Sequence, residues 1–274
     1  ISPDKQGIYI TVNVTEGPQY RVSDVRLAGQ MLVPEAELQE LITVVPGEVF
    51  ERDRLTETTK KISDRLGNDG YAFANVNAVP ELDKDKSTVA FTLFVDPGRR
   101  VYVSRVNVAG NTRTRDEVVR REIRQMEGGY LSNAAIDRSK IRLQRLPFIE
   151  KVEVETNPVP GTPDLVDVTY DIKEGLPGQF SGGIGYSESQ SILLNGSFVH
   201  SNFMGTGNRV AAEINAGQYS KVFSLSHTDP YTTIDGVSRT VSATWRNISQ
   251  FTTSSSDFET ETGTLGLDYA WPIS

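Results

Sequence analysis

Cysteine is absent from this 274-residue sequence, and only two histidines are present. The missing thiols exclude a disulfide framework and thiolate metal sites, and two histidines are too few for an ordinary zinc site. Long hydrophobic runs are absent too, since no stretch approaches the roughly 18 apolar residues that a membrane helix needs. If this chain crosses a membrane, it must do so with strands.

Basic residues are outnumbered by acidic ones, 28 to 36. The formal net charge is −8, whereas a surface that binds nucleic acid is basic because it must neutralise phosphates. The composition therefore argues against a nucleic-acid partner.

Catalytic residues are not evident either. Ser226, His227 and Asp229 lie close in sequence, but adjacent residues of a strand point to opposite faces, so Ser226 and His227 diverge. The three residues are better interpreted as a polar strand end before a turn at Asp229 and Pro230. Residues 205–207 (GTG) lack the lysine of a phosphate-binding loop and predict a hairpin turn. We predict no enzyme, no catalytic residue, no cofactor and no metal.

What the chain does contain is alternation. Over residues 180–271 apolar residues recur at every second position, as at Ile192, Leu194 and Phe198. A period of two predicts strands with two different faces, and here one face is rich in Ser, Thr, Gly and Asn. An apolar face towards lipid and a polar face towards a wet lumen are typical of a transmembrane barrel. About six strands can be counted, fewer than the eight of the smallest barrels, so we predict a truncated antiparallel β-barrel with open edges.

A tandem repeat precedes this segment. Gly17, Gly98 and Gly175 each follow a similar strand, at spacings of 81 and 77 residues. Units of this size can each bury a small core. We predict the last strand of a preceding unit at 1–19, repeats at 20–98 and 99–175, and the first barrel strands at 176–274. Because the chain opens inside a strand-like run without a signal peptide, we expect it to be part of a longer protein.

Each repeat shows the order β-α-α-β-β, which predicts a three-stranded sheet covered on one face by two helices. In the second copy, Thr114 and Glu117 predict a capping box at the start of the first helix. Val119, Ile123 and Met126 follow at helical spacing and predict the packed side of that helix.

This plan resembles the BamA family, which assembles β-barrel proteins in the bacterial outer membrane. The resemblance is carried by RREIRQMEG (120–128), GGIGY (182–186), NFMGTG (202–207) and DPYT (229–232). It implies α+β POTRA repeats in the periplasm followed by an outer-membrane barrel. The implied partners are lipoproteins of the assembly complex such as BamD, unfolded outer-membrane proteins and the lipid bilayer.

The resemblance also implies a lateral gate in the first barrel strand. Three of its residues are glycines, each of which weakens a strand by roughly 0.5–1 kcal/mol relative to alanine. A strand that pairs weakly could open and offer its edge to an incoming strand. The alternative is that small residues relieve crowding where the barrel begins. The candidate gate residues are Phe180, Gly182, Gly183, Ile184, Gly185 and Tyr186.

A partner-binding site is implied by two charged residues. Arg120 and Glu127 match family positions that contact BamD, and on one helix a spacing of seven would place them on the same face. The alternative is an ordinary solvated face. We also expect the closing strands of the repeats, and the strands after Gly98 and Gly175, to present edges to unfolded substrates. The alternative there is a rigid spacer.

Two other functions remain open at this point. A two-partner secretion pore of the same superfamily would translocate its substrate through the lumen, and the number of repeats in the complete protein would separate it from an assembly factor. A soluble adhesive or enzymatic β-protein is the more distant alternative, which solubility of the complete chain without detergent would support.

Overall fold

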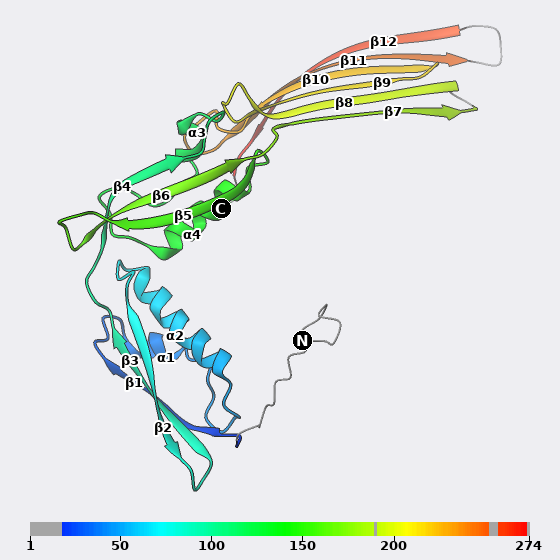
Figure 1. Ribbon diagram of the computed structural model, residues 1–274. Coiled ribbons are helices and arrows are strands. Elements are labelled where there is room, and N and C mark those ends of the chain that lie inside the picture. Colours follow the sequence, from blue (N-terminus) through cyan, green and yellow to red (C-terminus); the bar gives the residue numbers. More distant parts are fainter. Residues whose placement is uncertain (1–17, 189–190, 252–256, 273–274) are drawn as a thin grey trace, which may run out of the picture. The chain divides into compact units, whose positions relative to one another are not determined.

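The computed structural model describes residues 18–188, 191–251 and 257–272 (Figure 1). The strand predicted for residues 1–19 lies almost entirely outside them. The chain forms two compact units. The first holds the first repeat together with residues 99–101 and 130–133, and the second holds the remaining part of the second repeat with the β7–β12 sheet. Among the described residues, no helix is long and apolar enough to cross a membrane.

The first repeat follows the predicted order of elements. Its strands form a sheet in the order β1-β3-β2, in which β3 is parallel to β1 and antiparallel to β2. Leu38, Ile62, Leu66 and Leu93 are fully buried between the helices and the sheet. The elements are β1 (Arg21–Gly29), α1 (Glu35–Gln39), α2 (Arg52–Gly67), β2 (Asn75–Asp83) and β3 (Thr88–Asp96).

The second repeat has the same architecture, with the sheet order β4-β6-β5. An offset of 81 residues relates equivalent positions, for example Val22 to Val103. Both residues are buried and both precede a β-bulge. The elements are β4 (Tyr102–Ala109), α3 (Asp116–Arg120), α4 (Asn133–Gln144), β5 (Ile149–Pro158) and β6 (Leu165–Glu174).

Three local predictions about the repeats were wrong. Arg115, not Thr114, is the N-cap of α3, and no side chain caps that helix. Met126 does not pack against the core, because its side chain is 76% exposed. The closing strands β3 and β6 are central strands of their sheets, so they present no edge. A central strand has both sides paired, and a repeat of this topology can bind an added strand only at an outer strand.

The third part of the chain is a six-stranded antiparallel sheet, as predicted. Each strand pairs with its neighbour in sequence, in the order β12-β11-β10-β9-β8-β7. The predicted hairpin turn at residues 205–207 joins β8 to β9. The strands are β7 (Gly178–Ser187), β8 (Ser191–Phe203), β9 (Asn208–Ala216), β10 (Ser220–Asp229), β11 (Ser238–Phe251) and β12 (Asp257–Ala270).

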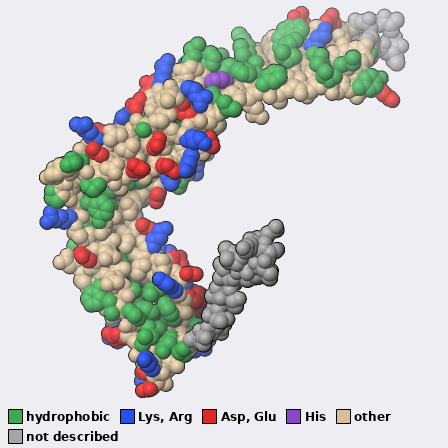
Figure 2. All heavy atoms as spheres, in the orientation of Figure 1, with side chains coloured by type: hydrophobic (Ala, Val, Ile, Leu, Met, Phe, Trp, Pro, Cys, Tyr) green, Lys and Arg blue, Asp and Glu red, His purple; other side chains and the backbone are tan. Residues whose placement is uncertain are grey.

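The register gives this sheet two different faces. Cross-strand partners place one large exposed apolar side chain next to another, as for Phe180 with Phe198 and Ile184 with Leu194. The opposite face carries small polar residues such as Ser181 and Ser197. Figure 2 shows hydrophobic side chains gathered over this sheet. An exposed apolar sheet face with a polar reverse is the pattern of a barrel wall between lipid and a wet lumen.

Candidate functional site

The first strand of this sheet, β7, lies at its edge. In the described part of the chain its only strand partner is β8, and residues 178–186 are all exposed. The other side of β7 therefore offers N–H and C=O groups on which a further strand can form a ladder. The candidate gate residues all lie on this strand: Phe180, Gly182, Gly183, Ile184, Gly185 and Tyr186.

The three candidate gate glycines of β7 differ in the room around them. A Cβ at Gly182 or Gly185 would have no neighbouring atom closer than 3.7 Å, so both sites can accept a side chain. A Cβ at Gly183 would lie 2.6 Å from Oδ1 of Asn195, which covers that glycine from the facing position on β8. A side chain at Gly183 would therefore displace the amide of Asn195, whereas Gly182 and Gly185 need no such adjustment.

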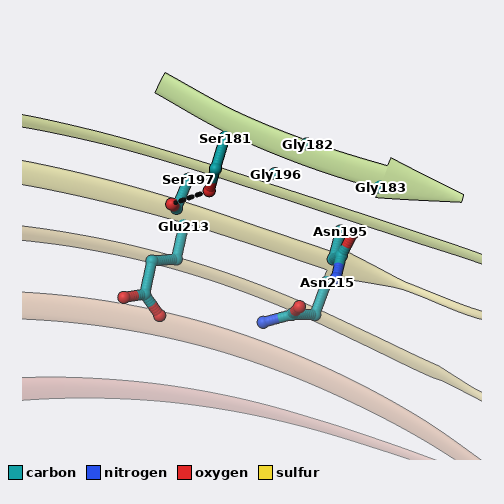
Figure 3. A pocket seen from close by; sticks show the side chains of 8 residues that line it. All are labelled: Ser181, Gly182, Gly183, Asn195, Gly196, Ser197, Glu213 and Asn215. Carbon is teal, nitrogen blue, oxygen red and sulfur yellow. Dashed lines mark hydrogen bonds between the residues drawn. The ribbon is translucent and has the colours of Figure 1, made fainter. Parts of the chain in front are cut away.

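The polar face beside β7 contains a shallow pocket (Figure 3). The hydroxyls of Ser181 and Ser197 are hydrogen-bonded at 2.8 Å, and Asn195, Glu213 and Asn215 complete the polar lining. Glu213 has no ion-pair partner among the residues that the structure describes. A small, hydrophilic surface of this kind leaves the lumen side of the edge open to water.

Glu174 holds the junction between the second repeat and the sheet. Its side chain is only 5% exposed. It accepts hydrogen bonds from Thr114 N at 2.7 Å, Arg113 N at 3.0 Å and the Thr112 hydroxyl at 3.0 Å. Burial alone would raise the pKa of the Glu174 carboxyl, but these hydrogen bonds outweigh it and hold the pKa below its ordinary value. The carboxylate thus fixes the loop between β4 and α3.

The lowered pKa predicts an acid-sensitive junction. The unfolded chain takes up the proton first, near a pKa of about 4.3. The contribution of Glu174 is therefore complete above that value and is lost as the pH falls through the lower pKa of the folded state. Thermal unfolding of the full-length protein between about pH 6 and about pH 3 should show this loss, and Glu174→Gln should remove it. Glu155, an exposed carboxylate on β5, is the control. If Glu155→Gln alters the profile as much, the junction is not its origin.

The loop between β4 and α3, which Glu174 holds in place, contacts the turn between β8 and β9. Asn202, 5% exposed, donates from Nδ2 to the Thr114 hydroxyl at 2.8 Å and accepts from Gly207 N at 2.8 Å. The backbone completes the contact, since Arg115 N donates to Gly205 O at 2.9 Å. One buried amide therefore shapes the turn and also joins it to the repeat.

The turn between β10 and β11 makes a second contact with the same repeat. Tyr231 accepts a hydrogen bond from Arg142 at 2.8 Å, and the guanidinium of Arg121 lies 4.3 Å above the Tyr231 ring. Glu122 is buried beside them and pairs with Arg142 at 2.8 Å. Burial raises the pKa of the Tyr231 hydroxyl, which keeps it protonated. The repeat thus holds two turns at the same end of the sheet.

The structure contradicts the predicted helix over residues 120–127. Helix α3 ends at Arg120, and the chain then turns to pair with β4, where Gly128 N donates to Val103 O at 2.8 Å. Arg120 and Glu127 do not share a helix face. They nevertheless meet at Val106 of β4, where Glu127 Oε1 accepts from Val106 N at 2.8 Å and Arg120 donates to Val106 O at 3.0 Å. We call this pair of contacts the Val106 clamp.

The clamp continues the backbone pairing of residues 128–129 along the outer edge of β4. In the first repeat the equivalent residue is Val25, and its N–H is satisfied by the neighbouring Asp24 side chain at 2.9 Å. The two repeats therefore satisfy the same edge position in different ways. A β4 edge satisfied in this manner is closed to strand addition at Val106.

The remaining sequence predictions about chemistry were that Ser226, His227 and Asp229 form no catalytic site and that the chain binds no metal. Ser226 and His227 lie on opposite faces of β10, because they are consecutive residues in a stretch of regular pairing with β11. Within the described ranges, no three His, Asp or Glu residues gather in a way that could hold a metal ion.

Sequence reasoning missed Glu174, Asn202 and Tyr231. A signal for each was present, because Asn202 and Tyr231 lie in the family-like stretches 202–207 and 229–232, and Glu174 precedes the recurring Gly175. We interpreted residues 202–207 and 229–232 as turns that carry the family resemblance, and Gly175 as the end of a closing strand. Local patterns do not reveal which repeat surface a turn will contact.

Comparisons with known proteins agree with this architecture. The POTRA family (surface antigen variable number repeat) matches residues 20–98 and 101–175, and the Omp85 superfamily domain matches residues 202–274. The outer membrane protein assembly factor BamA of Neisseria meningitidis serogroup B is 37% identical over 85% of this chain and 29% of its own length. BamA of Buchnera aphidicola is 30% identical over 83% of this chain and 37% of its own length. This chain thus spans about a third of these relatives.

Solved structures give the same result. The crystal structure of BamA from Haemophilus ducreyi lacking POTRA domains 1–3 matches with a TM-score of 0.78 at 33% identity, covering 90% of this chain and 47% of that one. The POTRA3–5 structure of BamA from Haemophilus influenzae matches with a TM-score of 0.55 at 38% identity, covering 58% of this chain and 63% of that one.

Proposed function

Because the chain belongs to the BamA family of the Omp85 superfamily, we propose that it is part of a non-enzymatic factor that assembles β-barrel proteins in the bacterial outer membrane. The repeats lie in the periplasm in this proposal, and the β7–β12 sheet is the first part of the barrel. Unfolded outer-membrane proteins are the substrates, and the free energy of their folding drives insertion.

The observation that carries the mechanism is the position of β7 as the first strand of the sheet, paired on one side with β8. In a closed barrel its other side would meet the last strand, so opening that seam frees the backbone of β7 for an incoming strand. Within a bilayer such pairing is favoured because lipid offers no other hydrogen-bond partner. The glycines of β7 weaken its cross-strand contacts, since they bring no side chain to pair. We therefore assign the lateral gate to β7, with Phe180, Gly182, Gly183, Ile184, Gly185 and Tyr186 as its residues.

The contacts of the second repeat support this assignment. They fix the turns β8–β9 and β10–β11 through Asn202 and Tyr231. The strand β7 follows directly from the repeat through residues 175–177, where Ser201 N donates to Pro177 O at 2.8 Å. A barrel wall anchored at its second to fifth strands can keep its shape while the first strand exchanges partners.

The partner-docking site of the proposal lies at Arg120 and Glu127. A lipoprotein of the assembly complex, similar to BamD, would bind there. The Val106 clamp supports this placement because it gives the surface a fixed conformation, which lowers the entropy lost on binding.

Insertion of an unfolded outer-membrane protein into liposomes by the full-length protein, together with its lipoproteins, tests the function itself. If the complex at equal concentration gives no faster insertion than empty liposomes, the assignment as an assembly factor is refuted.

A milder change tests the gate. Gly185→Val should slow insertion several-fold, because valine favours the strand and adds a cross-strand contact at a site with room for it. Gly263→Val in β12 is the matched control, since nothing lies within 4 Å of a Cβ there and that strand is distant from the gate in sheet order. Equal slowing by both variants would count against β7 as the moving strand.

A further inference from the structure

The segment after α3 presents one large apolar side chain to solvent on a fixed backbone. Met126 is 76% exposed. Gly128 N donates to Val103 O and Val103 N donates to Gly129 O, both at 2.8 Å, while the buried Gln125 donates to Met126 O at 3.1 Å. An exposed methionine can adapt its shape to an apolar pocket. With its backbone already ordered, little further ordering is needed on binding.

Comparison of the two repeats shows that the basic residues of this surface are special to the second one. The backbone is held in the same way in both repeats. In the first, Thr43 N donates to the Thr58 hydroxyl at 3.0 Å. At the equivalent positions of the second, Arg124 N donates to the Ser139 hydroxyl at 2.8 Å. The surface residues differ. The first repeat has Asp24, Gln39, Thr43 and Val45 where the second has Arg105, Arg120, Arg124 and Met126.

Two of these three arginines carry uncompensated charge. Arg120 is paired with Asp116. Arg105 and Arg124 have no acidic partner within the described ranges, and the guanidinium of Arg124 donates only to the main-chain oxygens of Arg121 and Ile123. The exposed Glu127 offsets part of this charge. The surface still keeps an excess of positive charge on a chain of net charge −8, and this excess suits an acidic partner.

We propose that Met126, flanked by Arg105 and Arg124, is the apolar anchor of the docking surface, and that the partner is a protein with an apolar pocket rimmed by carboxylates. This inference rests on the proposed lipoprotein docking at Arg120 and Glu127. It adds which side chains the partner recognises there. A single protruding side chain on a rigid segment fits a protein pocket, whereas a lipid surface would require a broad basic face.

The test is the affinity of the full-length protein, in detergent, for its BamD-like lipoprotein purified without the lipid anchor. Met126→Ser should weaken binding by about 10- to 30-fold, as for a side chain at the centre of an interface. Val45→Ser at the equivalent position of the first repeat should leave the affinity unchanged. Replacing both Arg105 and Arg124 with Gln should reduce the salt dependence of binding, because exposed charges act mainly through screened attraction.

The outcomes separate the anchor from the docking site. If Met126→Ser binds as wild type while Glu127→Lys loses binding, the anchor is wrong and the docking site stands. If the wild-type protein does not bind the lipoprotein, or binds instead to vesicles of anionic lipid, both the partner assignment and the anchor are refuted. Melting curves of the variants should match wild type, since Met126 makes few contacts that its loss could remove.

Discussion

A disulfide between β7 and the closing strand of the full-length barrel should abolish insertion of new outer-membrane proteins while leaving the barrel folded. The expected effect is complete, because a gate must separate β7 from its closing partner before an incoming strand can reach the unpaired N–H and C=O groups. Reduction should restore insertion. These 274 residues contain no native cysteine, so the cysteine placed on β7 would be their only thiol.

An engineered disulfide elsewhere in the same sheet is the control. Phe198 and Ala212 are directly opposite each other on β8 and β9, a geometry that brings the Cα atoms to about 4.5–5.5 Å and suits a disulfide. That tie should be harmless, since the second repeat already holds the β8–β9 turn. Normal insertion by an oxidised barrel tied at β7 would eliminate the lateral gate and leave the barrel only a passive role in thinning the bilayer.

Reversal of charge at Glu127 should have the second-largest effect. We expect Glu127→Lys to weaken binding of the BamD-like lipoprotein by about 10- to 100-fold, the loss typical of a central interface residue. Lysine cannot accept the hydrogen bond from Val106 N, so the Val106 clamp opens and the docking surface loses its fixed conformation. The repeat itself should stay folded, because the Glu127 side chain is exposed and its core lies elsewhere.

The amide variant separates the two possible roles of Glu127. Glu127→Gln keeps an oxygen that can accept from Val106 N, so binding should stay within a few-fold of wild type if the Val106 clamp is what the partner needs. Binding affinities of both variants, together with hydrogen exchange at Val106 N, provide the measurement. If Gln is as damaging as Lys while the amide of Val106 stays protected, the partner reads the charge itself and the clamp has no part in docking.

The fold was predictable where the sequence pattern is long. Alternation over some ninety residues determines strand direction and face, because a shift of one residue would reverse every side chain of a half-buried strand. The repeat was recognisable for a similar reason, since equivalent residues such as Val22 and Val103 serve the same core position. In a pattern that extends over many residues, a few residues that favour another secondary structure do not change the prediction.

The candidate docking site was less predictable because two structures compete for residues 120–127, a longer helix and backbone pairing with β4. Residues 120–127 have good helix propensity, yet backbone pairing with β4 at Gly128 ends the helix at Arg120. Propensity gives only a weak preference that such a tertiary contact overrides. The strand order of the repeat sheets could not be predicted either. The sequences of β3 and β6 do not indicate that a parallel strand, β1 or β4, pairs with their second side. Asn202 could be assigned to a turn, but its partner Thr114 is 88 residues away.

The meander order of the β7–β12 sheet has a consequence for how the barrel forms. Every pairing in it joins neighbours in sequence, so each hairpin closes only a short loop and the contact order is low. The seam between β7 and the last strand of a barrel is the exception, because its two sides are separated by the whole intervening chain. Loop closure costs grow with length, by about 0.6 kcal/mol for each doubling. The seam is thus the pairing that forms last and with the greatest entropic cost, and a strand poor in side chains at that position makes it the first to melt.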